Sequence, residues 1–498
     1  MSLMLLAATP VVRYGWTQAL SDLHQIAAIA VVVVALLVAI LLDLALPARL
    51  RGTAVLAVAL AGLGASIGFA SVGLWGGGGR SAYSNMVTGD SFALFFELLL
   101  GILGVFSVVL AQAYVVRRGL GPSELHVLTL AAIIGMMALA SATSLVSVFV
   151  ALETLSLALY VACGYIRRET RSQESAVKYL LVGGFASAFI LYGMALVYGA
   201  TGSTLIPTIA QRVTGNDITN PLLVLGVLLL AVGFAYKISG APFHQWTPDV
   251  YQGAPLPVTA FMSVGTKAAA FAMIIRVFNV GLHQLSGEWS LLLAFVAVCS
   301  MVLGNLAAIV QTSVKRLLAY SGVAQAGYIL VGVVASGTTG VGAALFYLVA
   351  YLFMNFGAFA VLTALVTKEG ERDGMADLNG LGYRNPLLGV LMTFFMLSLG
   401  GFPPLVGFWG KFFLFEAGVS TGWTWLVVVA VLASVVSIYY YLRVVFHVWQ
   451  PVTTERRLAL SPASVATTLV PGLLALIMGF LPTFVLTHGL TGAANIFK

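Results

Sequence analysis

Runs of roughly 20 apolar residues recur along almost the whole chain, and this repetition constrains its fold more than any other feature. A run of this length can cross the hydrocarbon core of a bilayer as an α-helix, because each helical residue adds about 1.5 Å. Of the 498 residues, 60% are hydrophobic and only 8% are charged, so most of the surface cannot face water. We therefore predict an all-α polytopic membrane protein.

The apolar runs predict about fourteen transmembrane helices. The seventh run, 221–250, and the twelfth, 386–418, are interrupted by glycine and proline, which predicts that these two spans are discontinuous. The other predicted spans are continuous and cover residues 24–46, 53–74, 91–115, 124–140, 143–164, 174–200, 256–280, 289–311, 318–335, 340–366, 422–449 and 464–488.

Basic residues in the short loops predict the orientation of the chain, because cytoplasmic loops of membrane proteins are enriched in Lys and Arg. If each loop after an odd-numbered span is cytoplasmic, those loops hold Arg49, Arg51, Arg117, Arg118, Arg167, Arg168, Arg171, Lys315, Arg316, Arg456 and Arg457. The opposite loops hold little beyond Arg80 and Arg212. Both termini are thus predicted on the outer side. The net charge of +7 follows from this topology and predicts no nucleic-acid partner.

The two interrupted spans share a pattern. "YKISGAPFHQW" and "LGGFPPLVGFWGKF" each join small residues and proline to one lysine, and an offset of five spans reverses the direction of crossing. We therefore predict two inverted five-helix repeats, spans four to eight and nine to thirteen. The predicted division of the chain is a three-helix segment at 1–115, a first repeat at 116–285, a second repeat at 286–450 and a C-terminal helix at 451–498.

Proline inside a membrane helix leaves a backbone carbonyl without its intrahelical partner. Such a break is tolerated where it is buried in protein or lines a wet cavity. The breaks at Gly240 and Pro242, and at Gly401, Pro403 and Pro404, are therefore candidate cavity walls. A kink formed only for packing is the alternative at either break, and the matching positions of the two breaks favour a functional role.

Ionisable residues well inside the predicted spans are the candidate functional residues: Glu153, Lys178, Lys237, Lys267 and Lys411. Such a group costs about 3 kcal/mol or more at the centre of a lone membrane helix, so it usually faces a bundle interior and a partner. Glu153 and Lys237 are the natural ion pair, with a purely structural salt bridge as the alternative. Lys267 and Lys411 have no obvious acidic partner, which is not expected of structural ion pairs.

The buried charges predict a row of proton-carrying stations along the membrane plane, provided that water bridges the gaps. Burial favours the neutral amine of a lysine and a nearby carboxylate favours the ammonium, so displacement of Glu153 would switch the protonation of Lys237. Lys178 lies near a basic loop, and a side chain that reaches out to that loop is the alternative there. His244, beside the first break, is a candidate relay or a hydrogen-bonded structural group.

Motifs for metals, redox cofactors and nucleotides are missing from the sequence. Cys163 and Cys299 lie inside apolar runs without a C-x-x-C pattern, so we expect two buried thiols and no iron–sulfur or zinc site. The sequence has no P-loop lysine motif and no G-x-G-x-x-G after a strand, so it predicts no nucleotide binding. The N-terminus lacks the pattern of a cleaved signal peptide.

Motifs around the buried charges resemble subunit N of the proton-pumping NADH–quinone oxidoreductase, respiratory complex I, which is called subunit 2 in organelles. The motifs extend over roughly 90–450 and are "ALETLSL" around Glu153, "KISGAPFHQWTPDVYQGAP" from Lys237, "KAAAF" from Lys267, "VKRLLAYSGVAQAGY" at 314–328 and "GFPPLVGFWGKF" around Lys411. A lysine in the twelfth span argues against the sister subunit M. The length without a long C-terminal lateral helix argues against subunit L.

The resemblance implies a coupling pair of Glu153 and Lys237, a central connecting Lys267, a Lys411 that gates the outward half-channel, and an accessory relay at Lys178. It also implies no cofactor in this chain, with NADH, FMN, iron–sulfur clusters and quinone in partner subunits of the complex. A cation/proton antiporter of the same fold is one alternative, and a purely structural membrane subunit is another. A plasma membrane is expected, while an organelle membrane and the electron donor stay open.

Overall fold

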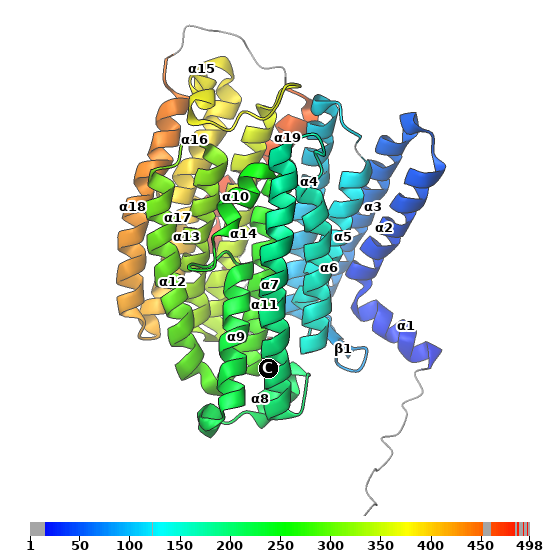
Figure 1. The fold of residues 1–498 in the computed structure, drawn as a ribbon, viewed down its shortest axis with the longest axis vertical. Coiled ribbons are helices and arrows are strands. Elements are labelled where there is room, and N and C mark those ends of the chain that lie inside the picture. The colour runs from blue at the N-terminus through cyan, green and yellow to red at the C-terminus, as the bar shows by residue number, and fades with distance from the viewer. Residues whose placement is uncertain are drawn as a thin grey trace, which may run out of the picture.

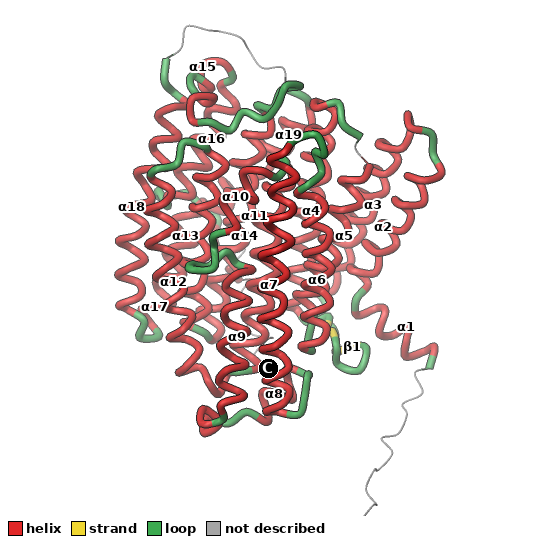
Figure 2. Tube along the Cα trace, in the orientation of Figure 1, coloured by secondary structure: helices red, strands yellow, loops and turns green. Residues whose placement is uncertain are grey.

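Nearly parallel helices run through the structure (Figure 1), a computed structural model that describes residues 15–121, 123–451, 460–483, 486, 487, 492 and 496. Within these residues, 12 helices are long and apolar enough to cross a membrane, and α9 and α16 are shorter apolar helices. Strand is confined, in the part of the chain that is described, to one small hairpin (Figure 2). The prediction of an all-α polytopic membrane protein is confirmed.

The helices follow the predicted spans to within a few residues at most ends. They are α2 (Ala27–Ala45), α3 (Ala48–Trp75), α4 (Ser91–Arg118), α5 (Ser123–Ser141), α6 (Leu145–Cys163), α7 (Thr170–Thr201), α9 (Pro221–Lys237), α10 (Trp246–Gly253), α11 (Leu256–Ile274), α12 (Ser286–Ile309), α13 (Val314–Ala335), α14 (Gly337–Ala364), α16 (Pro386–Gly400), α17 (Val406–Ser420), α18 (Thr424–Val448) and α19 (Pro462–Phe480). The shorter elements are α1 (Trp16–Gln25), β1 (Ser81–Ala82), β2 (Val87–Thr88), α8 (Ile206–Arg212), η1 (Gly215–Thr219), the π-helical turn η2 (Ile275–Gly281), η3 (His283–Leu285), η4 (Met375–Leu378) and α15 (Leu381–Arg384).

The number of spans, the inverted repeats and the domain boundaries remain predictions. Arg456 and Arg457, which contribute to the predicted orientation, lie outside the described residues.

Local sequence signals set the helix ends. The Asp90 carboxylate caps α4 by accepting a hydrogen bond from the Ala93 backbone N–H at 2.8 Å. The same helix ends at Gly119, whose φ of 68° is readily adopted by glycine and breaks the helical path. The sequence therefore determines the end of α4 through Gly119, because other residues rarely adopt this backbone conformation.

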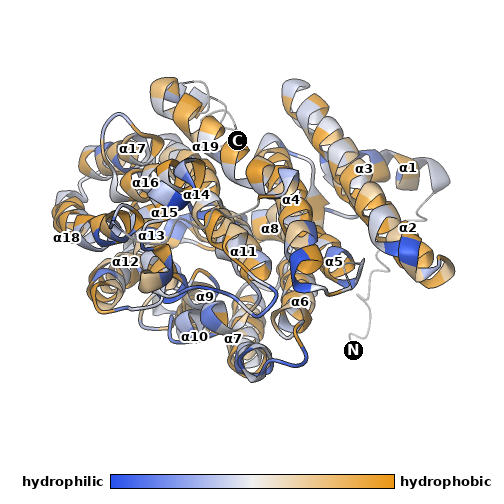
Figure 3. Ribbon diagram, turned by 90° about the horizontal axis from the view of Figure 1, so that it is seen from above, coloured by the Kyte–Doolittle hydropathy of each residue, from blue (hydrophilic) through white to orange (hydrophobic). Residues whose placement is uncertain are grey.

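Three helices form the interior of the bundle. The spanning parts of α11 and α14 are wholly buried, and α13 is almost wholly buried. Seen from above, hydrophobic residues cover perimeter helices such as α2, α3 and α18, and much of the hydrophilic colour lies in loops and at helix ends (Figure 3). Exposed Phe185 and Tyr192 on α7 and Val435 on α18 suit a lipid or subunit contact. A charged residue on α11 is therefore held inside protein.

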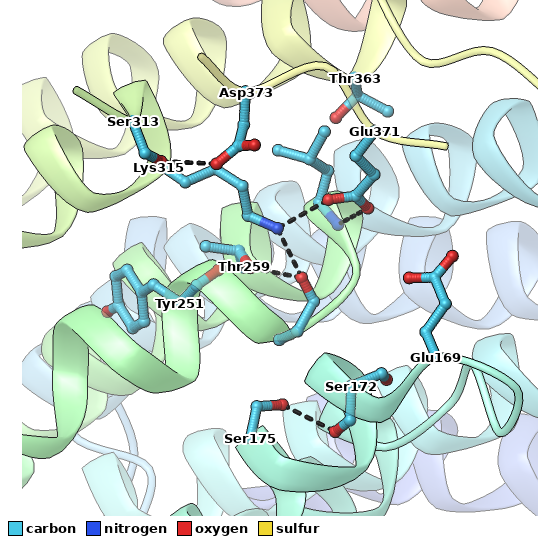
Figure 4. Close-up of polar contacts among 12 residues, drawn as sticks. Glu169, Ser172, Ser175, Tyr251, Thr259, Ser313, Lys315, Thr363, Glu371 and Asp373 are labelled. Carbon is cyan, nitrogen blue, oxygen red and sulfur yellow. Dashed lines mark hydrogen bonds and ion pairs between the residues drawn. The ribbon is translucent and has the colours of Figure 1, made fainter. Parts of the chain in front are cut away.

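One long loop, residues 365–374, joins several helix ends at one end of the bundle (Figure 4). Glu371 Oε2 forms an ion pair with Lys315 Nζ, at the start of α13, at 2.7 Å. Glu371 Oε1 accepts hydrogen bonds from the Tyr114 hydroxyl at 2.7 Å and the Leu256 backbone N–H at 2.9 Å. Lys315 also donates to the Ala254 carbonyl at 2.7 Å. Glu371 therefore connects α4, α11 and α13.

The same loop also continues along the start of α13. The Val314 backbone N–H donates to the Asp373 carbonyl at 2.7 Å, and the Ser313 hydroxyl donates to the Asp373 carboxylate. The positive and negative charges of this loop cancel, so they do not predict which side of the membrane it faces. Its Glu371 and Asp373 carboxylates nevertheless have specific partners. We call Glu371, Lys315 and Asp373 the loop clamp.

We expect Glu371→Gln to destabilise the protein, because it leaves the buried Lys315 ammonium without its carboxylate. Lys315 is 1% exposed and Glu371 14%, and breaking such a buried pair costs about 3–5 kcal/mol. Thermal unfolding of the chain purified in detergent measures the loss. Glu369→Gln, on an exposed carboxylate of the same loop, is the matched control. Equal stability of the two variants would contradict a structural role of the loop clamp.

Candidate functional site

The first predicted helix break is present beside Lys237. Lys237 is the last residue of α9, and α10 begins at Trp246, so Gly240 and Pro242 lie in the non-helical segment between them. The Ala241 backbone N–H, which no longer has a helical partner, donates to the Ser300 hydroxyl of α12 at 2.8 Å. The first half of this segment, 238–241, is buried, as expected for irregular backbone at membrane depth, whereas Pro242 is exposed.

The second predicted break separates α16 from α17. Gly401 has a φ of 89°, which favours glycine, and Pro403 and Pro404 follow it before α17 begins. The Gly400 carbonyl lies at the C-terminal end of α16, where no further helical N–H is available, and Lys411 Nζ donates to it at 3.1 Å. At this break, the buried lysine satisfies a carbonyl that the break leaves free.

Lys237 does not form the predicted ion pair with Glu153. Lys237 Nζ donates instead to the Ser156 hydroxyl at 3.0 Å, and Glu153 accepts a hydrogen bond from Ser187 of α7. Ser156 lies three residues after Glu153, on the same face of α6. Its hydroxyl therefore takes the position next to Lys237 that the carboxylate was expected to hold. Lys237 is nevertheless buried, at 7% exposed, on the side where Glu153 lies.

Lys267 lies at the centre of the bundle and is 0% exposed. Its ammonium donates to the Gly322 carbonyl of α13 and lies 5.5 Å from the centroid of the Tyr351 ring. A Cβ at position 322 would approach Lys267 Nζ to 2.5 Å, so a larger residue there would displace the end of the lysine side chain. Among the described ion pairs, none involves Lys267.

Lys411 also lacks an acidic partner among the described residues. Besides the Gly400 carbonyl, it donates to the Ser434 hydroxyl of α18 at 2.7 Å and lies 4.9 Å from the centroid of the Tyr328 ring. Neutral oxygen atoms and an aromatic face therefore stabilise its ammonium. None of these partners would be left as an unpaired charge if Lys411 lost its proton.

A polar network that the sequence analysis missed lies between Lys267 and Lys411. The Tyr441 hydroxyl bonds Ser321 Oγ and accepts from Gln325 Nε2 at 3.1 Å, and the Tyr347 hydroxyl donates to Gln325 Oε1. Ser321 precedes Gly322, the partner of Lys267. Gln325 Nε2 also lies 3.4 Å from the Leu399 carbonyl, next to Gly400, whose carbonyl accepts from Lys411.

A signal for this network is present in the motif "AYSGVAQAGY". Ser321, Gln325 and Tyr328 are spaced four and three residues apart, which places them on one face of α13. Three polar residues in register within a buried span predict a polar seam. The partners on α14 and α18 could not be identified from spacing, because they come from distant parts of the chain.

Lys178 is the ninth residue of α7, near the start of that helix. Its side chain is 43% exposed and pairs with Glu174 at 2.7 Å and with Asp249 at 3.0 Å. Arg316 pairs with the other oxygen of Asp249 at 2.7 Å, and a cavity of about 160 Å³ opens between Arg171, Glu174, Lys178 and Asp249. These contacts agree with the alternative of a side chain that reaches toward the loop end, and the proton-carrying role of Lys178 stays a prediction.

His244 lies in the first break, where it is half-buried. Its Nδ1 is buried without a hydrogen-bond partner among the described residues, and its ring lies 6.1 Å from that of Tyr320. The role of His244 as a relay stays a prediction.

Two expectations about buried side chains need correction. Glu153 is the one carboxylate that the sequence analysis places at mid-depth, yet it is only partly buried, whereas Glu97 of α4 is fully buried. Cys163 is buried as expected, whereas Cys299 is partly exposed. In the described ranges, no three His, Cys, Asp or Glu side chains gather closely enough to hold a metal ion.

Comparisons with known proteins agree with this geometry. The family model described as "NADH:quinone oxidoreductase/Mrp antiporter, TM" matches residues 142–437, which include both helix breaks and all three buried lysines. NADH-quinone oxidoreductase subunit N of Trichlorobacter lovleyi is 44% identical over 82% of this chain and 85% of its own length. NAD(P)H-quinone oxidoreductase subunit 2 of Synechocystis sp. is 41% identical over 83% of this chain and 80% of its own length.

Solved structures show the same fold. A chain of respiratory complex I from Thermus thermophilus has a TM-score of 0.79 and 37% identity, and the match covers 92% of this chain and 98% of that one. A chain of the Mrp complex from Dietzia sp. has a TM-score of 0.84 at 22% identity, covering 96% and 98%, which supports the fold alone. The buried lysines and helix breaks thus lie inside a shared architecture, and this chain belongs to the subunit N family of NADH-quinone oxidoreductase, within the NADH:quinone oxidoreductase/Mrp antiporter membrane family.

Proposed function

We propose that this chain is the antiporter-like, proton-translocating membrane subunit of an NADH-quinone oxidoreductase. The observation that carries the proposal is the set of three buried lysines, Lys237, Lys267 and Lys411, whose hydrogen-bond partners in the described chain are neutral oxygens. A lysine with such partners can lose and regain its proton without leaving an unpaired carboxylate in hydrocarbon. A structural ion pair does not have this property.

Proton movement between Lys267 and Lys411 would use the polar network of Ser321, Gln325 and Tyr441. Hydroxyl groups both donate and accept hydrogen bonds, so they can pass a proton in either direction. Near Lys237, buried Tyr236, Ser239 and His244 have polar atoms with no partner in the described part of the chain. Ordered water usually satisfies such groups, and water here would connect Lys237 to its neighbours.

Glu153 would set the protonation of Lys237 from a distance, through Ser156, in place of the direct pair that the sequence predicts. Quinone reduction in a partner subunit would cause an electrostatic or conformational change that alters the contacts among Glu153, Ser156 and Lys237. Lys237 would then release its proton toward Lys267. Lys411 would then pass a proton outward. Lys178, with Glu174 and Asp249, would collect protons at the loop end of the bundle.

Partners and location follow from the relatives. The chain would lie in the plasma membrane of a bacterium, with both termini outside, beside the other membrane-arm and peripheral-arm subunits of the complex. Those subunits would bind NADH, FMN, iron–sulfur clusters and quinone, while this chain would carry no redox centre. The exposed apolar faces of α2, α3, α7 and α18 support contacts with lipid or with such subunits.

Purification of the tagged chain from native membranes in mild detergent tests the proposed function. Co-purification with NADH oxidation by a quinone analogue would support it. Isolation without that activity, but with cation-dependent proton exchange in liposomes, would instead identify a cation/proton antiporter of the same fold.

Lys237→Ala is expected to lower coupled NADH–quinone turnover and proton pumping at least about tenfold, because a positioned proton carrier is lost. Turnover and proton uptake are measured in inverted membrane vesicles. Lys368→Ala removes an exposed loop lysine and is the control. Pumping by Lys237→Ala at the level of Lys368→Ala would rule out a proton-carrying role for Lys237.

Glu153→Gln should stop pumping while the protein still assembles. Because Lys237 bonds Ser156 and no carboxylate, neutralising Glu153 leaves no broken ion pair, and the amide can still accept from Ser187. The amount of assembled complex on native gels and the pumping rate are compared in the same membranes. If assembly fails together with pumping, Glu153 has a structural role.

Tyr441→Phe removes the hydroxyl that joins Ser321 and Gln325 and should slow turnover roughly threefold to tenfold, the effect of about one hydrogen bond. Tyr251→Phe is the matched control, since its equally buried hydroxyl has no hydrogen-bond partner in the described part of the chain. Equal turnover of the two variants would show that the network carries no protons.

A further inference from the structure

Glu97 is a buried carboxyl group that the proposed proton row does not use. It is 0% exposed and is the seventh residue of α4, roughly 9 Å along the helix from its start after the β1–β2 hairpin. An ionisable side chain at this depth in a spanning helix is rarely present without a role.

The two oxygens of Glu97 have different surroundings. Oε1 accepts a hydrogen bond from the hydroxyl of Ser141, the last residue of α5, at 2.8 Å. Oε2 is buried and has no hydrogen-bond partner in the described part of the protein. An ionised carboxylate needs donors at both oxygens, so this site does not suit the charged form.

Arg276 is the nearest cation, and its hydrogen bonds go elsewhere. Its two terminal nitrogens donate to Asp90 at 2.9 and 2.7 Å, and its Nε donates to the Ala140 carbonyl at 2.8 Å. Because Arg276 is paired with Asp90, it does not serve as the ion-pair partner of Glu97. Glu97 is therefore left without a counter-ion of its own.

The helices that contact α4 supply no other nearby charge. They are α3, α5, α11, α14 and α19. Neither α14 nor α19 carries a charged residue. The charged or titratable residues of α3 and α5 lie at the opposite ends of those helices. Lys267 of α11 donates to Gly322 on another helix.

We propose that Glu97 is a proton-binding site, a neutral carboxylic acid bonded to Ser141 that exchanges its proton at the β1–β2 end of the bundle. On release, the carboxylic O–H bond breaks and a water molecule accepts the proton. The Arg276 guanidinium, still bonded to Asp90, would then attract the new carboxylate electrostatically. Asp90, 23% exposed, provides the contact with solvent. This role rests on the proposed function, because proton translocation is what gives such a site a use.

Infrared difference spectroscopy of the assembled complex, with and without NADH, tests the proposal. The C=O stretching band of a protonated carboxyl group should shift in D₂O, change during turnover and disappear in Glu97→Gln. The amide can keep the bond from Ser141, so Glu97→Gln should assemble and pump severalfold more slowly. Glu288→Gln, on an exposed carboxylate at the start of α12, is the matched control.

Normal pumping by Glu97→Gln, or a band that neither exchanges nor changes with turnover, would overturn the proposal. Lys237→Ala, measured in the same assay, distinguishes failure of the Glu97 proposal from failure of the proposed function. A stalled Lys237→Ala leaves the proposed function intact, whereas normal pumping by both variants removes its basis as well. If Glu97→Gln does not assemble, Ser141→Ala replaces it, and a carboxyl band at unchanged frequency would then overturn the assignment to Glu97.

Discussion

Hydrocarbon offers no hydrogen bonds, so every polar group inside this protein must find its partner within the chain or in trapped water. This constraint decides where the lysines lie. Lys411 bonds the carbonyl at the end of α16, and Lys267 bonds the carbonyl of a glycine that lets it approach closely. The backbone that the breaks free and the charges that hydrocarbon excludes stabilise each other. At the second break the free carbonyl and Lys411 satisfy each other, whereas at the first break Ser300 takes the free N–H and Lys237 bonds Ser156.

Much of this architecture could be predicted, because the signals are local. A run of apolar residues fixes a span, and proline beside glycine fixes a break, whatever the rest of the chain does. The helix ends near Lys237 and Gly400 lie where these signals place them. The burial of Lys267 could be predicted in the same way, since its span, 256–274, carries no other charged residue.

The partners of each charge could not be predicted, because they depend on how helices distant in sequence rotate against each other. Glu153 and Lys237 read as a pair because they carry opposite charges, but a hydroxyl one turn along α6 takes the lysine. Glu97 was missed because it lies near the end of a predicted span, where a carboxylate normally reaches water. Its burial comes from the neighbouring helices, which no single span reveals.

The central helix α11 is fastened to α4 at both of its ends. Glu371 holds the first residue of α11 to Tyr114, and Arg276, just beyond its last turn, is held by Asp90 at the start of α4. A helix fixed in this way acts as a strut that cannot slide along its axis. Signals passing through the bundle must then travel as side-chain rotations and rearranged water around a stationary Lys267.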